Sequence, residues 1–282
     1  MTKRIDKENI LVAFSGGRTS AFMSWWLKEN FSHLYNLYFV FANTGQEHEK
    51  TLEFVDKVDK HFGLNLVWVE ASVEAKNGIG TGYRIVDFSS ADRLGYVFES
   101  VIEKYGLPNR KYPHCTREMK NIPMYKWAID NIGKHRIALG IRHDEFKRVK
   151  PRQDAIYPLA TIGKFSKKDV LDFWSSQPFD LEIEEHQGNC LWCYKKSDKK
   201  LALLASQNPE WFEFPKRMEE KYRLVKTKDE IGERKIFRHF RTTDDILNNT
   251  GLPESVDIDE CSEECGSVLS EYESEPACNS LF

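Results

Sequence analysis

The sequence predicts an α/β fold in which helices cover a parallel, Rossmann-like sheet. Two apolar runs of β type, 10–14 and 34–41, are each followed by a segment with the apolar spacing of a helix. The first run leads into its helix through the glycine-rich turn Ser15-Gly16-Gly17-Arg18-Thr19-Ser20. Strands that alternate with helices form parallel βαβ units with right-handed crossovers, so these observations predict a parallel sheet.

The other elements continue this alternation. The predicted strands are 10–14, 34–41, 64–69 and 136–139. The predicted helices are one that contains 21–27, then 47–62, 92–105, 124–132, 166–175, 201–206 and 209–222. The glycine-rich segment 76–82 is predicted to be a mobile loop or lid. The helix 166–175 is expected to begin with a capping box in which Asp169 takes the place of the usual Glu or Gln.

Composition divides the chain into three parts. Residues 1–165 form the predicted nucleotide-binding α/β domain, and 166–250 form a helical region that contains a CxxC motif. Residues 251–282 are acidic and poor in large apolar side chains, so we expect a flexible tail. The tail holds Cys261, Cys265 and Cys278.

The overall composition suits a soluble globular protein. Charged residues make up 30% of the chain and hydrophobic residues 40%, and the net charge of -3 gives no global basic footprint. With no apolar run long enough for a membrane span and no signal-peptide core at the N-terminus, we expect a cytoplasmic protein. Six cysteines in such a chain indicate metal binding, catalysis or buried thiols more often than disulfides.

The turn 15–20 has the features of an anion site. Gly16 and Gly17 allow close approach of backbone to ligand, and the helix that follows offers free N–H groups and the positive end of its dipole. Ser15, Thr19 and Ser20 add hydroxyl donors and Arg18 adds a charge. The alternative is an ordinary strand-to-helix turn. We favour a phosphate or pyrophosphate site, which is not a Walker A loop because the GxxxxGK[ST] pattern is absent.

Two further polar segments follow strands of the predicted sheet. Asn43-Thr44-Gly45 follows the second strand, and Gly140-Ile141-Arg142-His143-Asp144-Glu145 follows the fourth. Because ligands collect at the carboxyl ends of parallel strands, we expect both segments to face the same ligand as the turn 15–20. Arg142 or Arg148 could grip phosphate oxygens, and Asp144 or Glu145 could hold Mg²⁺.

Cysteines supply the clearest metal-type signal. Cys190 and Cys193 form a CxxC motif, and Cys115 lies on a polar segment upstream. These three thiols suit an iron–sulfur cluster or a zinc site, and the fourth ligand stays open between a tail cysteine, His114 and an exogenous thiol. The alternatives are a redox pair of thiols or cysteines packed as small apolar residues. The basic runs 110–111, 147–152 and 195–200 fit a polyanion surface and a solvated face equally well.

Taken together, these motifs resemble a known family. The turn 15–20 resembles the SGGxxS loop of N-type ATP pyrophosphatases, the PP-loop enzymes, and 43–45 resembles the (D/N)TG segment of their phosphoadenosine phosphosulfate (PAPS) reductase branch. Residues 115–120 are similar to that branch's cysteine-then-lysine segment, 140–148 to its GxRxxExxR pattern, and 190–193 to its CxxC. The resemblance implies an adenine nucleotide alpha hydrolase-like sandwich that binds ATP and Mg²⁺.

The resemblance also implies roles for individual residues. Nucleotide binding falls on Ser15, Gly16, Gly17, Arg18, Thr19, Ser20, Asn43, Thr44, Gly45 and Gly140, and catalysis on Lys120, Arg142, Glu145 and Arg148. Cys115, Cys190 and Cys193 would ligate a 4Fe-4S cluster, with zinc as the fallback. The chain departs from the family pattern at Thr19, where many loops carry Asp, and at Thr116, where cluster-bearing reductases have a second cysteine. Glu264-Cys265-Gly266 matches only the start of the reductases' C-terminal ECGLH.

Three functions are compatible with this resemblance. The favoured one is an ATP pyrophosphatase that adenylates a target, such as a DNA backbone or other nucleic acid, for sulfur incorporation, as in DNA phosphorothioation (Dnd/Ssp-type) systems. A cysteine desulfurase and other modification-system subunits would be its partners. The second is a PAPS or adenosine phosphosulfate reductase that uses Cys265. The third is a non-catalytic nucleotide-binding subunit of a modification or defence complex.

Overall fold

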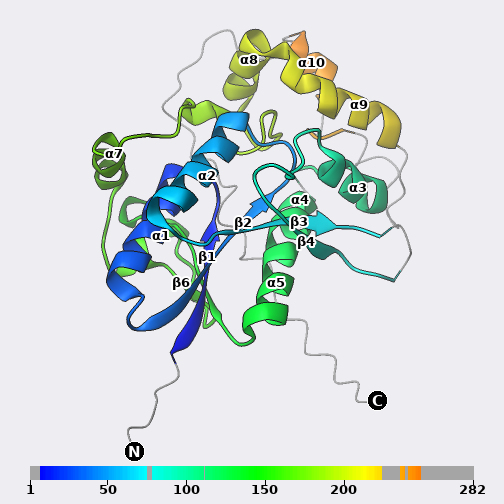
Figure 1. Ribbon diagram of the computed structural model, residues 1–282. Helices are drawn as coiled ribbons and strands as arrows, with labels where there is room; N and C mark the ends of the chain where they lie inside the picture. Colours follow the sequence, from blue (N-terminus) through cyan, green and yellow to red (C-terminus); the bar gives the residue numbers. More distant parts are fainter. Residues whose placement is uncertain (1–6, 75–77, 111, 224–235, 239–240, 249–282) are drawn as a thin grey trace, which may run out of the picture.

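The predicted α/β fold is confirmed by a computed structural model that describes residues 7–74, 78–110, 112–223, 236–238 and 241–248. Its sheet has six strands in the order β4-β3-β2-β1-β5-β6 (Figure 1). All neighbouring pairs are parallel except β3 and β4. The strands are β1 (Glu8–Phe14), β2 (Tyr35–Asn43), β3 (Val67–Ser72), β4 (Gly82–Val86), β5 (Arg136–Ala138) and β6 (Ala155–Ile156).

Helices occupy the connections and the C-terminal part of the described chain. The longer ones are α1 (Arg18–Phe31), α2 (Glu49–Phe62), α3 (Tyr96–Tyr105), α5 (Ile122–Ile132), α7 (Lys167–Ser175), α8 (Asp198–Gln207) and α9 (Glu213–Tyr222). Short ones are α4 (His114–Thr116), the π-helix η1 (Arg117–Asn121), η2 (His143–Arg148), α6 (Pro158–Thr161), η3 (Glu185–Gln187), η4 (Pro209–Phe212) and α10 (Thr243–Leu247). No helix in the described ranges is both long and apolar enough to span a membrane.

The strand order places a topological switch point beside β1. From β1 the chain moves outward through β2, β3 and β4, and then returns to add β5 on the opposite side of β1. Loops leaving β1 and β5 therefore diverge in opposite directions, which opens a crevice at the carboxyl ends of these two strands.

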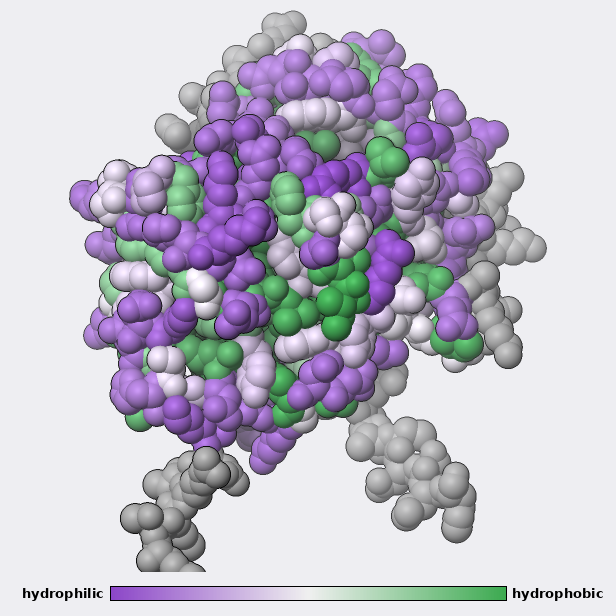
Figure 2. Space-filling model, viewed as in Figure 1, coloured by the Kyte–Doolittle hydropathy of each residue, from purple (hydrophilic) through white to green (hydrophobic). Residues whose placement is uncertain are grey.

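Side chains of β1 alternate between the two faces of the sheet. Ile10, Val12 and Phe14 pack in a core that includes residues of α1, α2 and α7, whereas Leu11 packs in a second cluster against α5. This period-2 alternation follows from strand geometry and leaves helices on both faces of the sheet. The view in Figure 2 shows a mostly hydrophilic outer surface with an apolar area near its middle.

A separate hydrophobic cluster lies beyond one end of the sheet. It combines α3 and η1 with the CxxC segment and with α8, α9 and α10, which Figure 1 shows gathered at the top of the molecule. The predicted division at residues 1–165 and 166–250 stays a prediction. The hydrophobic cores do not divide at residue 165. Helix α7 packs in the core of the sheet, whereas α3 packs in the separate cluster just described, which we call the helical cluster.

Several element predictions are corrected by the structure. Of the predicted loop 76–82, the described residues 78–81 lie outside helices and strands, and only Gly82 belongs to β4, an antiparallel edge strand beside β3 that was not predicted; residues 75–77 lie outside the described part. The predicted helix 92–105 begins only at Tyr96, because Asp92 accepts hydrogen bonds from Leu94 N and Val97 N. The two-residue strand β6 was not predicted, since so short a run has no periodicity to detect.

Candidate nucleotide site and adjoining cysteine cavity

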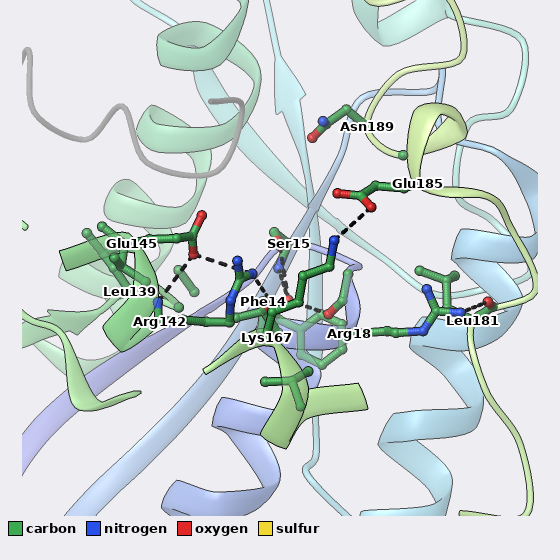
Figure 3. A pocket seen from close by; sticks show the side chains of 18 of the residues that line it. Phe14, Ser15, Arg18, Leu139, Arg142, Glu145, Lys167, Leu181, Glu185 and Asn189 are labelled. Carbon is green, nitrogen blue, oxygen red and sulfur yellow. Dashed lines mark hydrogen bonds and ion pairs between the residues drawn. The ribbon is translucent and has the colours of Figure 1, made fainter. Parts of the chain in front are cut away.

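A cavity of about 480 Å³ lies at the carboxyl ends of β1 and β5 (Figure 3). A volume of this size suits a nucleotide-sized ligand. Its wall brings together most of the predicted site residues, from the turn after β1, from η1 and from the segment after β5. Those lining it are Ser15, Gly17, Arg18, Thr19, Ser20, Lys120, Gly140, Arg142, Glu145 and Arg148.

The turn after β1 is held in one shape by short-range contacts. Gly16 has φ +85°, and a Cβ there would lie 2.8 Å from Thr51 Cγ2, so a larger residue does not fit. Ser20 Oγ accepts a hydrogen bond from Ser15 N at 3.0 Å and donates one to Gly17 O at 2.9 Å. Among the described residues, no side chain caps the start of α1 at Gly17. The first turn of α1 can therefore offer its N–H groups to an anion.

Arg18 points its charge away from the turn. Its guanidinium forms a bidentate pair with Asp180, at 2.7 and 2.9 Å, and so ties α1 to the segment that follows α7 (Figure 3 shows the side chain). The predicted role of Arg18 in nucleotide binding stays a prediction, which now requires the ligand to compete with Asp180.

Residues after β5 reach across the crevice to the turn after β1. Arg142 donates a hydrogen bond to Thr19 Oγ1 at 3.2 Å and pairs with Asp144 at 3.0 Å. Glu145 lies between two arginines, 3.4 Å from Arg142 and in an ion pair with Arg148. Arg142, Glu145 and Arg148 therefore form one charged network on the cavity wall, as Figure 3 shows for Arg142 and Glu145. Asp144 does not line the cavity and joins this network through its ion pair with Arg142.

Residues 43–45, at the end of β2, are not among the described residues that line this cavity. Asn43 is completely buried and donates hydrogen bonds to Glu70 Oε1 at 2.6 Å and Asp92 O at 2.8 Å. Thr44 faces the cysteines, with its Oγ1 3.5 Å from Cys190 Sγ. The structure thus brings the segments that follow β1 and β5 to one cavity, and it leaves the segment at the end of β2 outside the lining of that cavity. Nucleotide contact by Asn43, Thr44 and Gly45 stays a prediction.

The three predicted cysteines surround a second, much smaller cavity of about 20 Å³. All three are buried, and Cys115 Sγ lies 3.1 Å from the hydroxyl of Tyr194. Thr116 and Lys120 line both this cavity and the nucleotide-sized one. The two cavities therefore share a wall that contains Thr116, the last residue of α4, and Lys120 of η1.

The cysteine cavity has soft donors but not the geometry of a metal site. Within the described ranges, no three His, Cys, Asp or Glu side chains are placed to hold one metal ion. A space of about 20 Å³ has room for roughly one water molecule. The donors therefore do not fit zinc or an iron–sulfur cluster as they stand. His114, a candidate fourth ligand, has its Nε2 3.0 Å from Gly106 O.

The basic run 195–200 is not simply a cationic face. Lys196 and Lys200 are buried, and Lys196 Nζ donates to His186 O at 2.7 Å. Because two of its lysines are buried, the run as a whole is neither a polyanion surface nor a solvated face, and the choice between these two interpretations stays open for the half-buried Lys195 and Lys199. His143 is exposed, as is usual for a histidine beside charged residues, and its Nδ1 lies 3.1 Å from Ala160 O.

Several residues that line the cavity were not predicted from the sequence, among them Lys167, Glu185 and Asn189. Lys167 at the start of α7 and Glu185 in η3 form an ion pair of 2.9 Å, and the Lys167 hydrogen bond lowers the pKa of Glu185 below its usual value. Asn189 has φ +63°, a left-handed conformation that Asn tolerates, and lines the cavity just before Cys190. An Asn directly before a CxxC motif is a weak sequence signal for a site residue. The ion pair has no such signal, because its two residues are far apart in the sequence.

The fold and this cavity define the class: an α/β protein with a nucleotide-sized site at the switch point of its sheet. Residues 9–156 match the family model of the phosphoadenosine phosphosulfate reductase domain, and the chain belongs to that family. Family membership supports a nucleotide-utilising function within the PP-loop superfamily. The matched range includes Cys115 but ends before the CxxC motif.

Two relatives extend the comparison. The chain is 36% identical over 198 residues to the uncharacterized nin region protein ORF290 of Escherichia phage lambda, covering 68% of each chain. It is 25% identical over 172 residues to the uncharacterized protein MJ0066 of Methanocaldococcus jannaschii, covering 60% of this chain and 30% of that protein.

Proposed function

We propose that the protein is an ATP pyrophosphatase that activates an acceptor by adenylation for sulfur incorporation. The observation that carries the proposal is the shared wall of the two cavities, where Thr116 and Lys120 face both the nucleotide-sized space and the cysteines. An adenylated acceptor bound in the larger cavity would therefore stand next to thiols that can handle sulfur.

The proposed reaction has two steps. An acceptor oxygen attacks the α-phosphorus of ATP, the α–β bond breaks and pyrophosphate leaves. The terminal sulfur of a persulfide, supplied by a desulfurase-type donor, then attacks the acceptor phosphorus that bears the adenylated oxygen, and AMP leaves with that oxygen and the bonding electron pair. A second thiol attacks the inner sulfur of the persulfide, the S–S bond breaks, and the acceptor keeps its new sulfur while the two thiols form a disulfide. Our proposed acceptor is a nucleic-acid backbone, as in DNA phosphorothioation. The partners of the protein would then be the other subunits of such a modification system.

Residues of the larger cavity match the needs of the first step. The N-terminus of α1 and the serines of the turn after β1 would hold the leaving pyrophosphate. Arg142 and Lys120 would balance charge that develops on the phosphates. Asp144 and Glu145 are the carboxylates that could bind Mg²⁺ of the nucleotide, once phosphate oxygens replace them as partners of the arginines.

We assign no step to an iron–sulfur cluster, because the cysteine cavity does not fit one as described. A cluster at Cys115, Cys190 and Cys193 stays a prediction that requires these segments to move apart. Its test is independent of activity: protein purified without oxygen would be brown and contain iron with acid-labile sulfide.

The reductase remains the second candidate, favoured by the family match itself. Its nucleophile would be Cys265, which lies outside the described residues. The Cys265→Ser variant separates the two: a reductase loses all formation of sulfite from PAPS, whereas a pyrophosphatase keeps its release of AMP and pyrophosphate.

The decisive experiment is to incubate α-labelled ATP, Mg²⁺ and candidate acceptors with the protein and identify the labelled product. We expect labelled AMP or an adenylated acceptor, with pyrophosphate released. Lys120→Met should abolish this turnover, and Lys126→Met, at an exposed position of α5, should retain it as a matched control. Labelled ADP, or turnover unchanged in Lys120→Met, would contradict the proposal.

A further inference from the structure

The ion pair between Lys167 and Glu185 lies on the wall of the nucleotide-sized cavity, and both side chains are largely exposed. Lys167 is the first residue of α7 and Glu185 the first of η3, and both side chains line the cavity. Their charged atoms are 2.9 Å apart. Figure 3 shows the pair crossing in front of the turn after β1, with Asn189 above Glu185 in this view.

Each of the lysines and arginines that line this cavity faces a carboxylate, but the pairs differ in exposure. The side chains of Lys167 and Glu185 are 51% and 70% exposed. For Lys120 with Glu47 the values are 18% and 4%, and for Arg148 with Glu145 they are 16% and 18%. Because water screens an exposed pair strongly, Lys167–Glu185 is the weakest of these pairs and the easiest to exchange.

Lys167 is anchored close to the other phosphate-directed groups. Its backbone N donates to Asp144 Oδ2 at 3.3 Å, and Asp144 pairs with Arg142, which in turn bonds Thr19 in the turn after β1. The lysine therefore has a fixed backbone and a flexible four-carbon side chain that ends in a compact charge. Such a group can leave a carboxylate and follow a phosphate oxygen within the same cavity.

We propose that Lys167 is a phosphate-binding residue of the nucleotide site and that Glu185 is its exchangeable partner. In the free protein Glu185 neutralises the lysine, and on binding the polyphosphate replaces that carboxylate. The inference rests on the proposed binding of ATP in this cavity. Lys167 would add a phosphate contact to those proposed for the turn after β1 and for the arginines after β5.

Exchange predicts that the two members of the pair have opposite effects on affinity. Lys167→Met removes a phosphate ligand and should raise the Kd for ATP and for pyrophosphate by roughly tenfold. Glu185→Gln removes the competing carboxylate and should lower both Kd values by roughly two- to threefold. Titration calorimetry with Mg²⁺ would measure them, and Lys167→Arg, which keeps the charge, should restore binding.

The same helix offers a matched control pair. Lys168 and Asp172 form an ion pair on α7, with side chains 80% and 61% exposed, and they do not line the cavity as described. Lys168→Met and Asp172→Asn make the same changes of net charge and should leave the Kd for ATP within roughly twofold of the unmodified protein.

The outcomes separate this inference from the proposed function. Weaker ATP binding in both Lys167→Met and Glu185→Gln would show that the pair only holds α7 to η3, and would overturn the inference. Unchanged binding in Lys167→Met would overturn it as well, with the nucleotide site intact. Failure of the unmodified protein to bind either ATP or pyrophosphate would overturn the nucleotide site and this inference together.

Discussion

Gly16 and Gly17 are adjacent, yet the structure constrains them differently. A Cβ on Gly16 would lie 2.8 Å from Thr51 Cγ2 at φ +85°, whereas the nearest atom to a Cβ on Gly17 is Ser15 Oγ at 3.9 Å. Gly16→Ala should therefore lower the free energy of unfolding by about 1–2 kcal/mol or more, the cost of a left-handed conformation plus the close contact.

Gly17→Ala is the matched comparison and should change stability by no more than about 0.5 kcal/mol. Urea denaturation of both variants measures the difference. Equal losses in the two variants would show that the turn is not held in the described shape.

Glu219 is a buried carboxyl group in the helical cluster. It is 8% exposed and accepts hydrogen bonds from Phe237 N at 3.0 Å and Thr243 N at 2.8 Å. Burial raises its pKa to about 7. Because the pKa is higher in the folded state, stability from this group is complete below the unfolded pKa and is lost as pH rises through 7.

We therefore expect the free energy of unfolding to fall between about pH 4.5 and 7.5, by up to about 3 kcal/mol from this residue. Glu219→Gln, which cannot ionise, should lose this part of the pH dependence. Urea denaturation across that pH range measures it, and identical slopes in both proteins would contradict the prediction.

At the scale of elements, Asn43 ties three segments together. From the end of β2 its amide donates to Glu70 on β3 and to the carbonyl of Asp92 in the loop before α3. Asn43→Asp would remove both donors and place a second carboxyl group against the fully buried Glu70. We expect a loss of about 3 kcal/mol at pH 7, with partial recovery at acidic pH, where one carboxyl group takes up a proton.

Thermal unfolding of Asn43→Asp at pH 5 and pH 7.5 measures this effect. Asn36→Asp, at an exposed position of the same strand, is a suitable control. A variant as stable as the unmodified protein at both pH values would mean that Asn43 faces solvent or ligand instead.

The start of α7 shows how far local pattern can predict an element. The structure confirms the capping box: Ser166 accepts a hydrogen bond from Asp169 N, and the Asp169 carboxylate accepts one from Ser166 N. This motif was predictable because all its partners lie within four residues. The partners of α7 in the core are distant in the sequence: the ring of Phe173 on α7 lies 5.0 Å from that of Phe22 on α1, a contact that no local pattern contains.

At the scale of the whole molecule, the exit of β2 joins the sheet to the helical cluster. Gln46 O accepts a hydrogen bond from Leu191 N at 2.9 Å, and the Gln46 side chain accepts one from Trp192 Nε1. These contacts hold the CxxC segment against the end of the sheet and so keep the cysteine cavity beside the nucleotide-sized one.

Gln46→Ala should release this segment. We expect alkylation of Cys190 and Cys193 to become roughly tenfold faster, since loss of one buried hydrogen bond lowers the cost of local opening by about 1.4 kcal/mol. Mass spectrometry resolves each cysteine, and Cys115 should react faster as well, because its contact Tyr194 belongs to the released segment. Thermal unfolding of the variant is the control: faster alkylation with a Tm lowered by global destabilisation, or no acceleration at Cys190 and Cys193, would contradict local release.

The sequence by itself determined the fold class, the glycine-rich turn and most of the longer helices. These features depend on residues close together in the chain: alternating or helical apolar spacing, and glycines flanked by hydroxyl groups. The mostly parallel sheet also follows, because strands that alternate with helices are joined by crossovers of fixed hand. The antiparallel edge strand β4 was not predicted.

Only the tertiary structure decided how the predicted site residues are shared between two cavities. Arg18 pairs with Asp180, 162 residues away, and Asn43 faces the buried Glu70 instead of the crevice. Lys167 meets Glu185 because α7 and η3 line the same cavity. The direction of a side chain depends on which charged or polar groups the fold places next to it, and local sequence motifs do not contain that information.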